Sequence, residues 1–191
     1  MLDNSLSTKT ISHYFQLFRS AYSYIIKMRF SSIQLRGTVE IDEAFIKSRR
    51  RGLVGRVPNS MLWVFGMHAR QYNRTMIFLV PNRTTATLLE ILQQFVAANS
   101  ILISYTFRSY VNQNHTSRIL QFLPHKHFEH YWVYHSVSFI NPLWPNIHTN
   151  NIERTWGQMR KKVKRNFALG NIQVWLHTFL FEINIPKDLP I

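Results

Sequence analysis

Apolar and polar positions follow two different periods along the chain, and the changes of period predict the order of the elements. Apolar side chains at helical spacing predict a helix over residues 13–30. Strand-like alternation follows over residues 38–46. Two further apolar runs, 61–69 and 75–80, are separated by the polar residues 70–74 and predict a β-hairpin.

The second half of the chain alternates helical and strand-like segments. We predict helices over residues 84–98, 107–123, 150–167 and 172–183 and strands over residues 101–104 and 131–135. Three strands followed by this alternation indicate an α/β protein with a mixed five-stranded sheet flanked by helices. That order of elements is the RNase H-like fold.

Composition narrows the class of protein. Hydrophobic residues make up 46% of the 191 residues, enough for a sizeable core, and no long uncharged apolar run indicates a membrane span. The N-terminus lacks the order of a signal peptide, so we expect an intracellular protein that does not enter a membrane. With no cysteine, disulfides and zinc–thiolate sites are excluded.

Net charge predicts the kind of partner. The chain carries 23 Lys and Arg against 9 Asp and Glu, a net charge of +14, which is typical of proteins that bind nucleic acid. Two clusters of basic side chains are the candidate DNA contacts: Arg49, Arg50 and Arg51, and then Arg160, Lys161, Lys162, Lys164 and Arg165. The simpler interpretation of the second cluster is a solvated helix face.

Carboxylates gather at one place, where Glu40, Asp42 and Glu43 follow one another on the first predicted strand. Glu40 and Asp42 share one face of that strand and Glu43 points to the other. Carboxylates on the first strand, the fourth strand and the closing helix could converge to hold two divalent metal ions about 4 Å apart. The alternatives are a polar strand residue for Asp42 and a capping contact with Asn150 for Glu153.

Several strings resemble the Merlin transposases of eukaryotes and the bacterial ISXO-type insertion sequences. They are Gly-Thr-Val-Glu-Ile-Asp-Glu (37–43), Trp-Val-Phe-Gly (63–66), Leu-Val-Pro-Asn-Arg-Thr-Thr-Ala-Thr-Leu-Leu (79–89), His-Ser-Val-Ser-Phe-Ile-Asn-Pro (135–142) and His-Thr-Asn-Asn-Ile-Glu-Arg-Thr-Trp (148–156). The resemblance implies a DDE transposase domain, which we assign to residues 37–185, after an N-terminal helical remnant and linker (1–36) and before a tail (186–191).

The same resemblance implies DNA strand cleavage and transfer at transposon ends, with Mg²⁺ or Mn²⁺ as cofactor. Asp42 would be the first catalytic carboxylate and Glu153 the third, both as metal ligands. It leaves a homo-oligomer open, and it implies a nuclear protein if the source is eukaryotic.

The second carboxylate of the family pattern is missing. Where similar chains read Ile-Ser-Asp-x-Trp-x-x-Tyr, this chain reads Ile-Ser-Tyr-Thr-Phe-Arg-Ser-Tyr over residues 103–110, so the aspartate is Tyr105. Residues 99–128 contain no other carboxylate. We therefore expect a degenerate copy with impaired metal binding. The alternatives are a working nuclease with a substitute ligand, and a DNA-binding or interaction protein recruited from a transposon.

Overall fold

The computed structural model describes residues 6–47, 61–134, 145–163 and 172–184. Five strands form one sheet in the order β3-β2-β1-β4-β5. The strands are β1 (Thr38–Lys47), β2 (Met61–Ala69), β3 (Arg74–Val80), β4 (Ile101–Tyr105) and β5 (Glu129–Val133). Strand β2 runs antiparallel to β1 and β3, while β1, β4 and β5 are parallel. This mixed sheet confirms the RNase H-like fold predicted from the order of elements.

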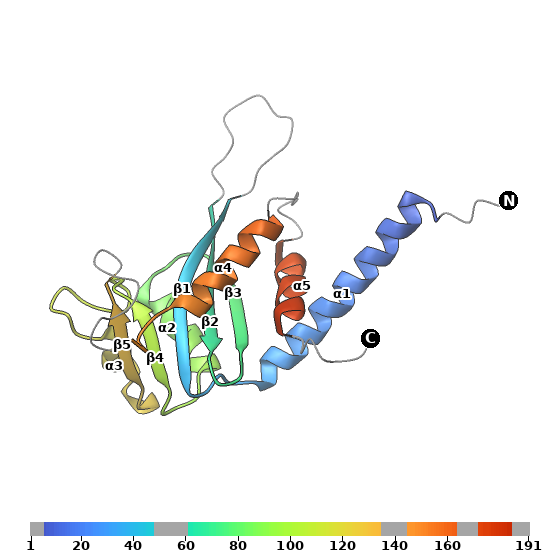
Figure 1. Ribbon diagram of the computed structural model, residues 1–191. Coiled ribbons are helices and arrows are strands. Elements are labelled where there is room, and N and C mark those ends of the chain that lie inside the picture. The colour runs from blue at the N-terminus through green and yellow to red at the C-terminus, as the bar shows by residue number, and fades with distance from the viewer. Residues whose placement is uncertain (1–5, 48–60, 135–144, 164–171, 185–191) are drawn as a thin grey trace, which may run out of the picture.

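Helices cover both faces of the sheet (Figure 1). Helices α2 (Thr85–Phe95) and α3 (Arg118–Phe122) pack on one face, which we call the α2 face. Helices α4 (Asn150–Val163) and α5 (Ile172–Asn184) pack on the other, the α4 face, and α1 (Thr8–Ser32) lies against α5. Each face therefore has its own hydrophobic core, and both depend on the alternation of side chains along β1 and β2.

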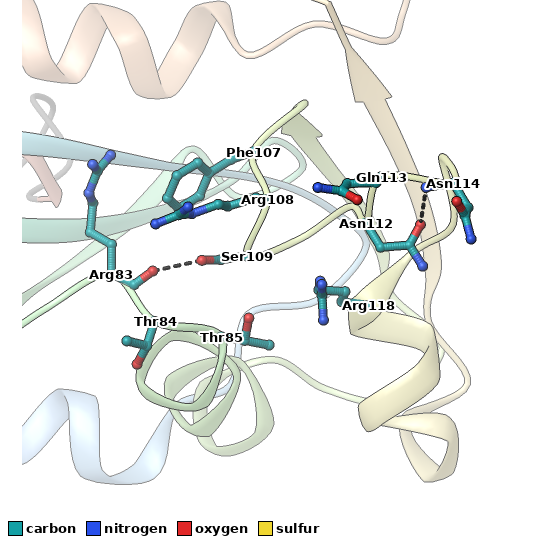
Figure 2. Close-up of a pocket in the computed structure, with 10 residues that line it drawn as sticks. All are labelled: Arg83, Thr84, Thr85, Phe107, Arg108, Ser109, Asn112, Gln113, Asn114 and Arg118. Atoms are coloured by element: carbon teal, nitrogen blue, oxygen red, sulfur yellow. Dashed lines mark hydrogen bonds between the residues drawn. The ribbon is translucent and has the colours of Figure 1, made fainter.

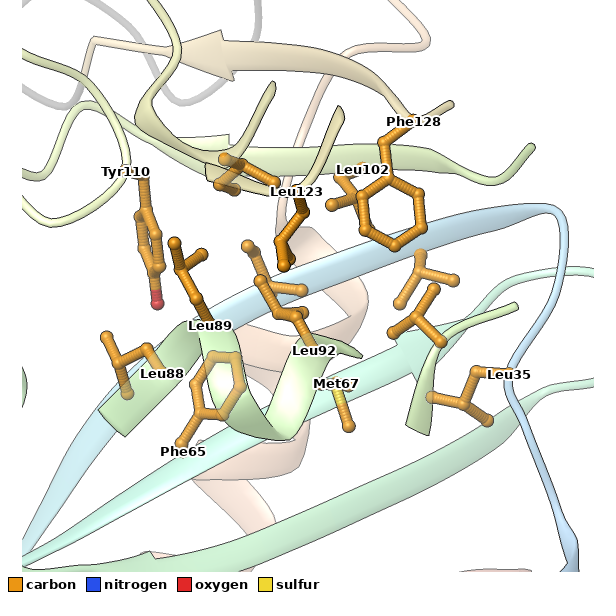
Figure 3. Close-up of a cluster of buried hydrophobic side chains, with 14 of the residues drawn as sticks. Leu35, Phe65, Met67, Leu88, Leu89, Leu92, Leu102, Tyr110, Leu123 and Phe128 are labelled. Carbon is orange, nitrogen blue, oxygen red and sulfur yellow. The ribbon is translucent and has the colours of Figure 1, made fainter. Parts of the chain in front are cut away.

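The core under the α2 face shows how this alternation is used (Figure 3). Leu88 and Leu92 recur one turn apart on α2 and are fully buried. They face Phe65 and Met67, which are two residues apart on β2 and equally buried. A helical stripe thus meets one face of a strand, as the change of period in the sequence predicts.

Helix α1 extends away from the sheet (Figure 1). Its C-terminal half packs against α5, where the rings of Tyr22 and Phe181 stack with centroids 4.1 Å apart. Its N-terminal half carries exposed apolar side chains, among them Phe15 and Phe18. The assignment of residues 1–36 to a separate segment stays a prediction.

The helix predicted over residues 107–123 is wrong, because only Arg118–Phe122 is helical. Asn112 explains the difference, since its side-chain oxygen accepts from the backbone N–H groups of Asn114 and Thr116. Such side-chain bonds offer the backbone an alternative to helical hydrogen bonds. His115 completes the turn with a positive φ of 54°.

The other predicted elements are present with shifted bounds. Helix α1 begins at Thr8 rather than 13, and the fifth strand spans Glu129–Val133 rather than 131–135. Helix α4 is described as far as Val163, so the predicted extension to residue 167 falls outside the described residues. Among the helices that the structure describes, none is both long enough and apolar enough to span a membrane.

Candidate active site

Asp42 lies in the middle of β1 on the α4 face, where it is buried. Its Oδ2 accepts a hydrogen bond of 2.9 Å from the indole Nε1 of Trp156 on α4, and its Oδ1 accepts one of 2.8 Å from the backbone N–H of Glu43. Trp156 therefore both fills the core and binds the predicted catalytic carboxylate.

Gly66 makes this contact possible. It pairs directly with Asp42 across β1 and β2. A Cβ atom at this position would lie 2.4 Å from the indole ring of Trp156 and 2.8 Å from the side chain of Ile152. Only a residue without a side chain lets the Trp156 ring pack this closely against β2 and reach Asp42.

Glu153 and Arg160 surround the same carboxylate. The pKa of Asp42 is raised to about 7, chiefly by burial and in part by the negative charge of Glu153, against the lowering effect of the bonds from Trp156 and the Glu43 N–H and of the charge of Arg160. Helix α4 thus brings Asp42 and Glu153 close enough to interact, as the sequence predicted. The Thr149 hydroxyl, directly before α4, donates to Glu153 Oε1 at 2.7 Å.

Tyr105 ends β4 beside Asp42. Glu40 of β1 pairs with Ile103 of β4, and Asp42 and Tyr105 are each two residues further along these parallel strands. The phenol does not turn toward Asp42, however. Its hydroxyl donates to Glu43 Oε2 at 2.9 Å. Burial, followed by the charge of Glu43, raises the pKa of Tyr105, so this phenol stays neutral at physiological pH.

Glu43 is the centre of a second polar cluster, on the α2 face. Its carboxylate accepts from the hydroxyls of Tyr105 and Tyr110, and the Arg83 guanidinium lies 3.7 Å from its Oε2. Burial raises the pKa of Glu43 to about 8, with Asp42 as a further cause, while Tyr105 and Arg83 lower it. One signal in the sequence could have indicated this cluster, namely a third acid on an apolar strand, but nothing in the sequence indicated its partners.

Glu40 has a structural task that sequence reasoning missed. It is fully buried and accepts from the backbone N–H groups of Asn151 and Ile152 in the first turn of α4, at 2.9 and 3.0 Å. Arg70 donates to its Oε1 at 2.7 Å and also binds the backbone carbonyl of His148. A strand carboxylate therefore caps the helix that carries Glu153, which fixes where that helix begins.

These side chains do not form the ligand set of a two-metal site. Both oxygens of Asp42 already accept hydrogen bonds, and the end of β4 carries a neutral phenol instead of a carboxylate. Within the described ranges, no group of three His, Asp or Glu side chains is placed to hold a metal ion. The residues present therefore fit Mg²⁺ or Mn²⁺ poorly, since these ions require hard, charged oxygen ligands.

The predicted DNA contacts separate into three groups. Arg160 and Lys161 are exposed on α4. Lys162 forms an ion pair with Glu182 of α5, so part of its charge is already neutralised. The remaining predicted contacts lie outside the described residues: Arg49, Arg50, Arg51, Lys164 and Arg165.

Comparison with solved structures finds retroviral integrases at low similarity. The catalytic core domain of HTLV-2 integrase, in complex with magnesium, is 9% identical, with a TM-score of 0.47 over 79% of this chain and 84% of that one. The catalytic core domain of BIV integrase is 8% identical, with a TM-score of 0.47 over 81% and 86% of the two chains. No curated protein matches.

A family model described as "ISXO2-like transposase domain" matches residues 34–168. The match begins just before β1 and continues beyond the described end of α4. It therefore includes all five strands, Asp42, Tyr105 and Glu153. Because it covers most of the chain, this protein belongs to the family of ISXO2-like transposase domains.

Proposed function

We propose that this chain is a transposase domain that binds DNA but does not cleave it. One observation carries the proposal. At the end of β4, beside Asp42, lies a neutral phenol whose hydroxyl donates a hydrogen bond to Glu43. Two acids, Asp42 and Glu153, then remain from the three that the resemblance to Merlin and ISXO-type transposases requires. A copy of this kind is a degenerate one.

A cleavage assay tests the loss of activity. With Mg²⁺ or Mn²⁺ and a supercoiled plasmid, the purified natural chain should leave the plasmid intact. Tyr105→Asp restores the missing second carboxylate, and Tyr105→Phe is the matched control that removes only the hydroxyl. Metal-dependent nicking by the natural chain that disappears in Asp42→Ala would refute the proposal and favour a working nuclease with a substitute ligand.

Metal binding gives a second test that does not need cleavage. A ligand that binds only the folded state raises the melting temperature. Mg²⁺ should therefore stabilise Tyr105→Asp more than the natural chain or Tyr105→Phe. An equal rise in all three would show that Tyr105 is not at the metal position.

DNA binding is proposed for the exposed end of α4, close to the two remaining acids. Each phosphate contact releases counterions, so the logarithm of affinity falls with the logarithm of salt by about 0.9 per contact on duplex DNA. Neutralising Arg160 and Lys161 to Gln should reduce that slope by about 1.8. The control with the same charge, Lys9→Gln with Arg19→Gln on exposed positions of α1, should leave it unchanged. Equal slopes in both variants would remove α4 from the interface.

A recruited interaction protein is the second candidate function. The exposed apolar side chains on the N-terminal half of α1, such as Phe15 and Phe18, favour it. Gel filtration with light scattering distinguishes self-association from a monomer. If Phe15→Ser with Phe18→Ser leaves the mass of the natural chain unchanged, α1 makes no contact between copies.

A further inference from the structure

A cleft on the α2 face lies apart from Asp42 and Glu153 and has no function assigned so far. It is a cavity of about 930 Å³ between the start of α2 and the segment that follows β4 (Figure 2). That volume is within the range of about 300–1,000 Å³ that is usual for small-molecule sites. Neither Asp42 nor Glu153 lines this cleft, and Arg83 connects it to Glu43 at 3.7 Å.

Positive charge is the first property of the cleft. Arg83 precedes α2, while Arg108 and Arg118 lie between the end of β4 and the start of α3, and all three line the cleft. None of the residues that line it is an Asp or a Glu, although the Glu43 carboxylate lies 3.7 Å from the Arg83 guanidinium. A cleft lined by one sign of charge concentrates anions.

Two of these arginines have surroundings that bear on ligand binding, Arg83 and Arg118. The Arg83 guanidinium lies 3.7 Å over the ring of Trp63 and 4.8 Å from that of Phe107, so its plane is fixed by stacking. Arg118 has a buried Nε, which is the one buried side-chain nitrogen or oxygen without a hydrogen-bond partner in the part of the chain that the structure describes. A buried donor of this kind is costly unless a ligand satisfies it.

The start of α2 adds neutral donors to the same cleft. Thr84 caps the helix through its hydroxyl, which accepts from the backbone N–H of Thr87. The N–H groups of Thr85 and Ala86 have no partner within the helix, and they carry the positive end of the helix dipole. Thr84 and Thr85 both line the cleft, so the N-terminus of α2 and the arginines border the same cavity.

We propose that this cleft binds the phosphate group of a nucleotide. Guanidinium groups and helix N-termini are the two donor types that suit phosphate best. Gln113 and Asn114 add exposed side-chain amides to the lining, and these can bond to a base or a sugar next to the phosphate. The nucleotide could be free in solution or part of a nucleic-acid strand, and the two sources are separable by experiment.

The test compares two double variants with the same loss of charge. Arg108→Gln with Arg118→Gln alters the cleft, while Arg29→Gln with Arg74→Gln removes two exposed charges elsewhere. Binding of a labelled single-stranded oligonucleotide is measured against salt by fluorescence anisotropy. The cleft variant should lose about 1.4 from the log–log slope, about 0.7 for each contact, and the control should not.

A second arm measures melting temperature with adenosine monophosphate and with inorganic phosphate. If the cleft variant loses the stabilisation by nucleotide but keeps the oligonucleotide slope, the ligand is a free nucleotide. If it loses the slope, the ligand is a strand. Arg108→Lys with Arg118→Lys, which keeps the charge, should restore most of the effect and shows that the variants still fold. Cleft and control variants that behave alike in both arms would overturn the proposal, and the α4 variants would still test DNA binding separately.

Discussion

The close approach of Gly66 and Trp156 makes the sharpest prediction about stability. Gly66→Ala places a Cβ 2.4 Å from the indole ring, more than 1 Å inside the usual carbon–carbon separation of about 3.5–4.0 Å. The ring cannot simply rotate away, because its Nε1 donates to Asp42 and it is 2% exposed. Overpacking of this kind costs about 1–3 kcal/mol, and loss of the buried hydrogen bond adds about 1 kcal/mol.

Gly157 is the matched control on the same helix. A Cβ added there meets nothing within 4 Å, and the position is inside α4. Because the helix propensity of Ala is about 0.8–1.0 kcal/mol more favourable than that of Gly, Gly157→Ala should stabilise the protein. The two Gly→Ala changes, both in contact with or beside Trp156, are therefore expected to have opposite signs.

Thermal denaturation followed by tryptophan fluorescence measures both variants. For a domain of this size, 1 kcal/mol shifts the melting temperature by about 2–4 °C, so Gly66→Ala should melt about 4–16 °C lower than the natural chain. Gly157→Ala should melt about 2–4 °C higher. A neutral or stabilising Gly66→Ala would refute the packing of Trp156 against β2 and its contact with Asp42.

Three other changes test the contacts around this site. Glu40→Gln removes the buried charge that caps α4, so unfolding free energy should fall by about 3–5 kcal/mol and amide exchange over α4 should accelerate. Burial lowers the pKa of His130 to about 3, so below pH 6.5 the unfolded chain binds a proton at this residue that the folded chain does not bind. The unfolding free energy should therefore fall by about 2 kcal/mol between pH 8 and 5, and His130→Gln should lack that dependence in urea titrations. Tyr22→Ala should cost about 1–3 kcal/mol by removing the stack on Phe181, whereas the exposed Tyr24→Ala should cost almost nothing in the same titrations.

The sequence alone determined the order of strands and helices, because each element keeps one period of apolar positions over its whole length. It also placed Asp42 and Glu153 on elements that meet, since β1 and α4 are long and strongly patterned. The replacement of the family's aspartate by Tyr105 was visible in the sequence. The hydrogen bond that this phenol makes was not visible, because its partner Glu43 lies 62 residues earlier in the chain.

Local bonds and long-range contacts decided the rest. Residues 107–117 have a helix-like distribution of apolar positions, but the side chain of Asn112 captures two backbone N–H groups and turns the chain. Glu40 caps α4, and Gly66 leaves space for the indole ring of Trp156. Both roles arise only because sheet pairing places these residues beneath α4. The arginine cleft likewise joins two segments of the chain, residues 83–85 and 107–118. The residues of these clusters do not recur at a regular spacing in the sequence. Only the packing of α2 and α4 on the two faces of the sheet brings them together.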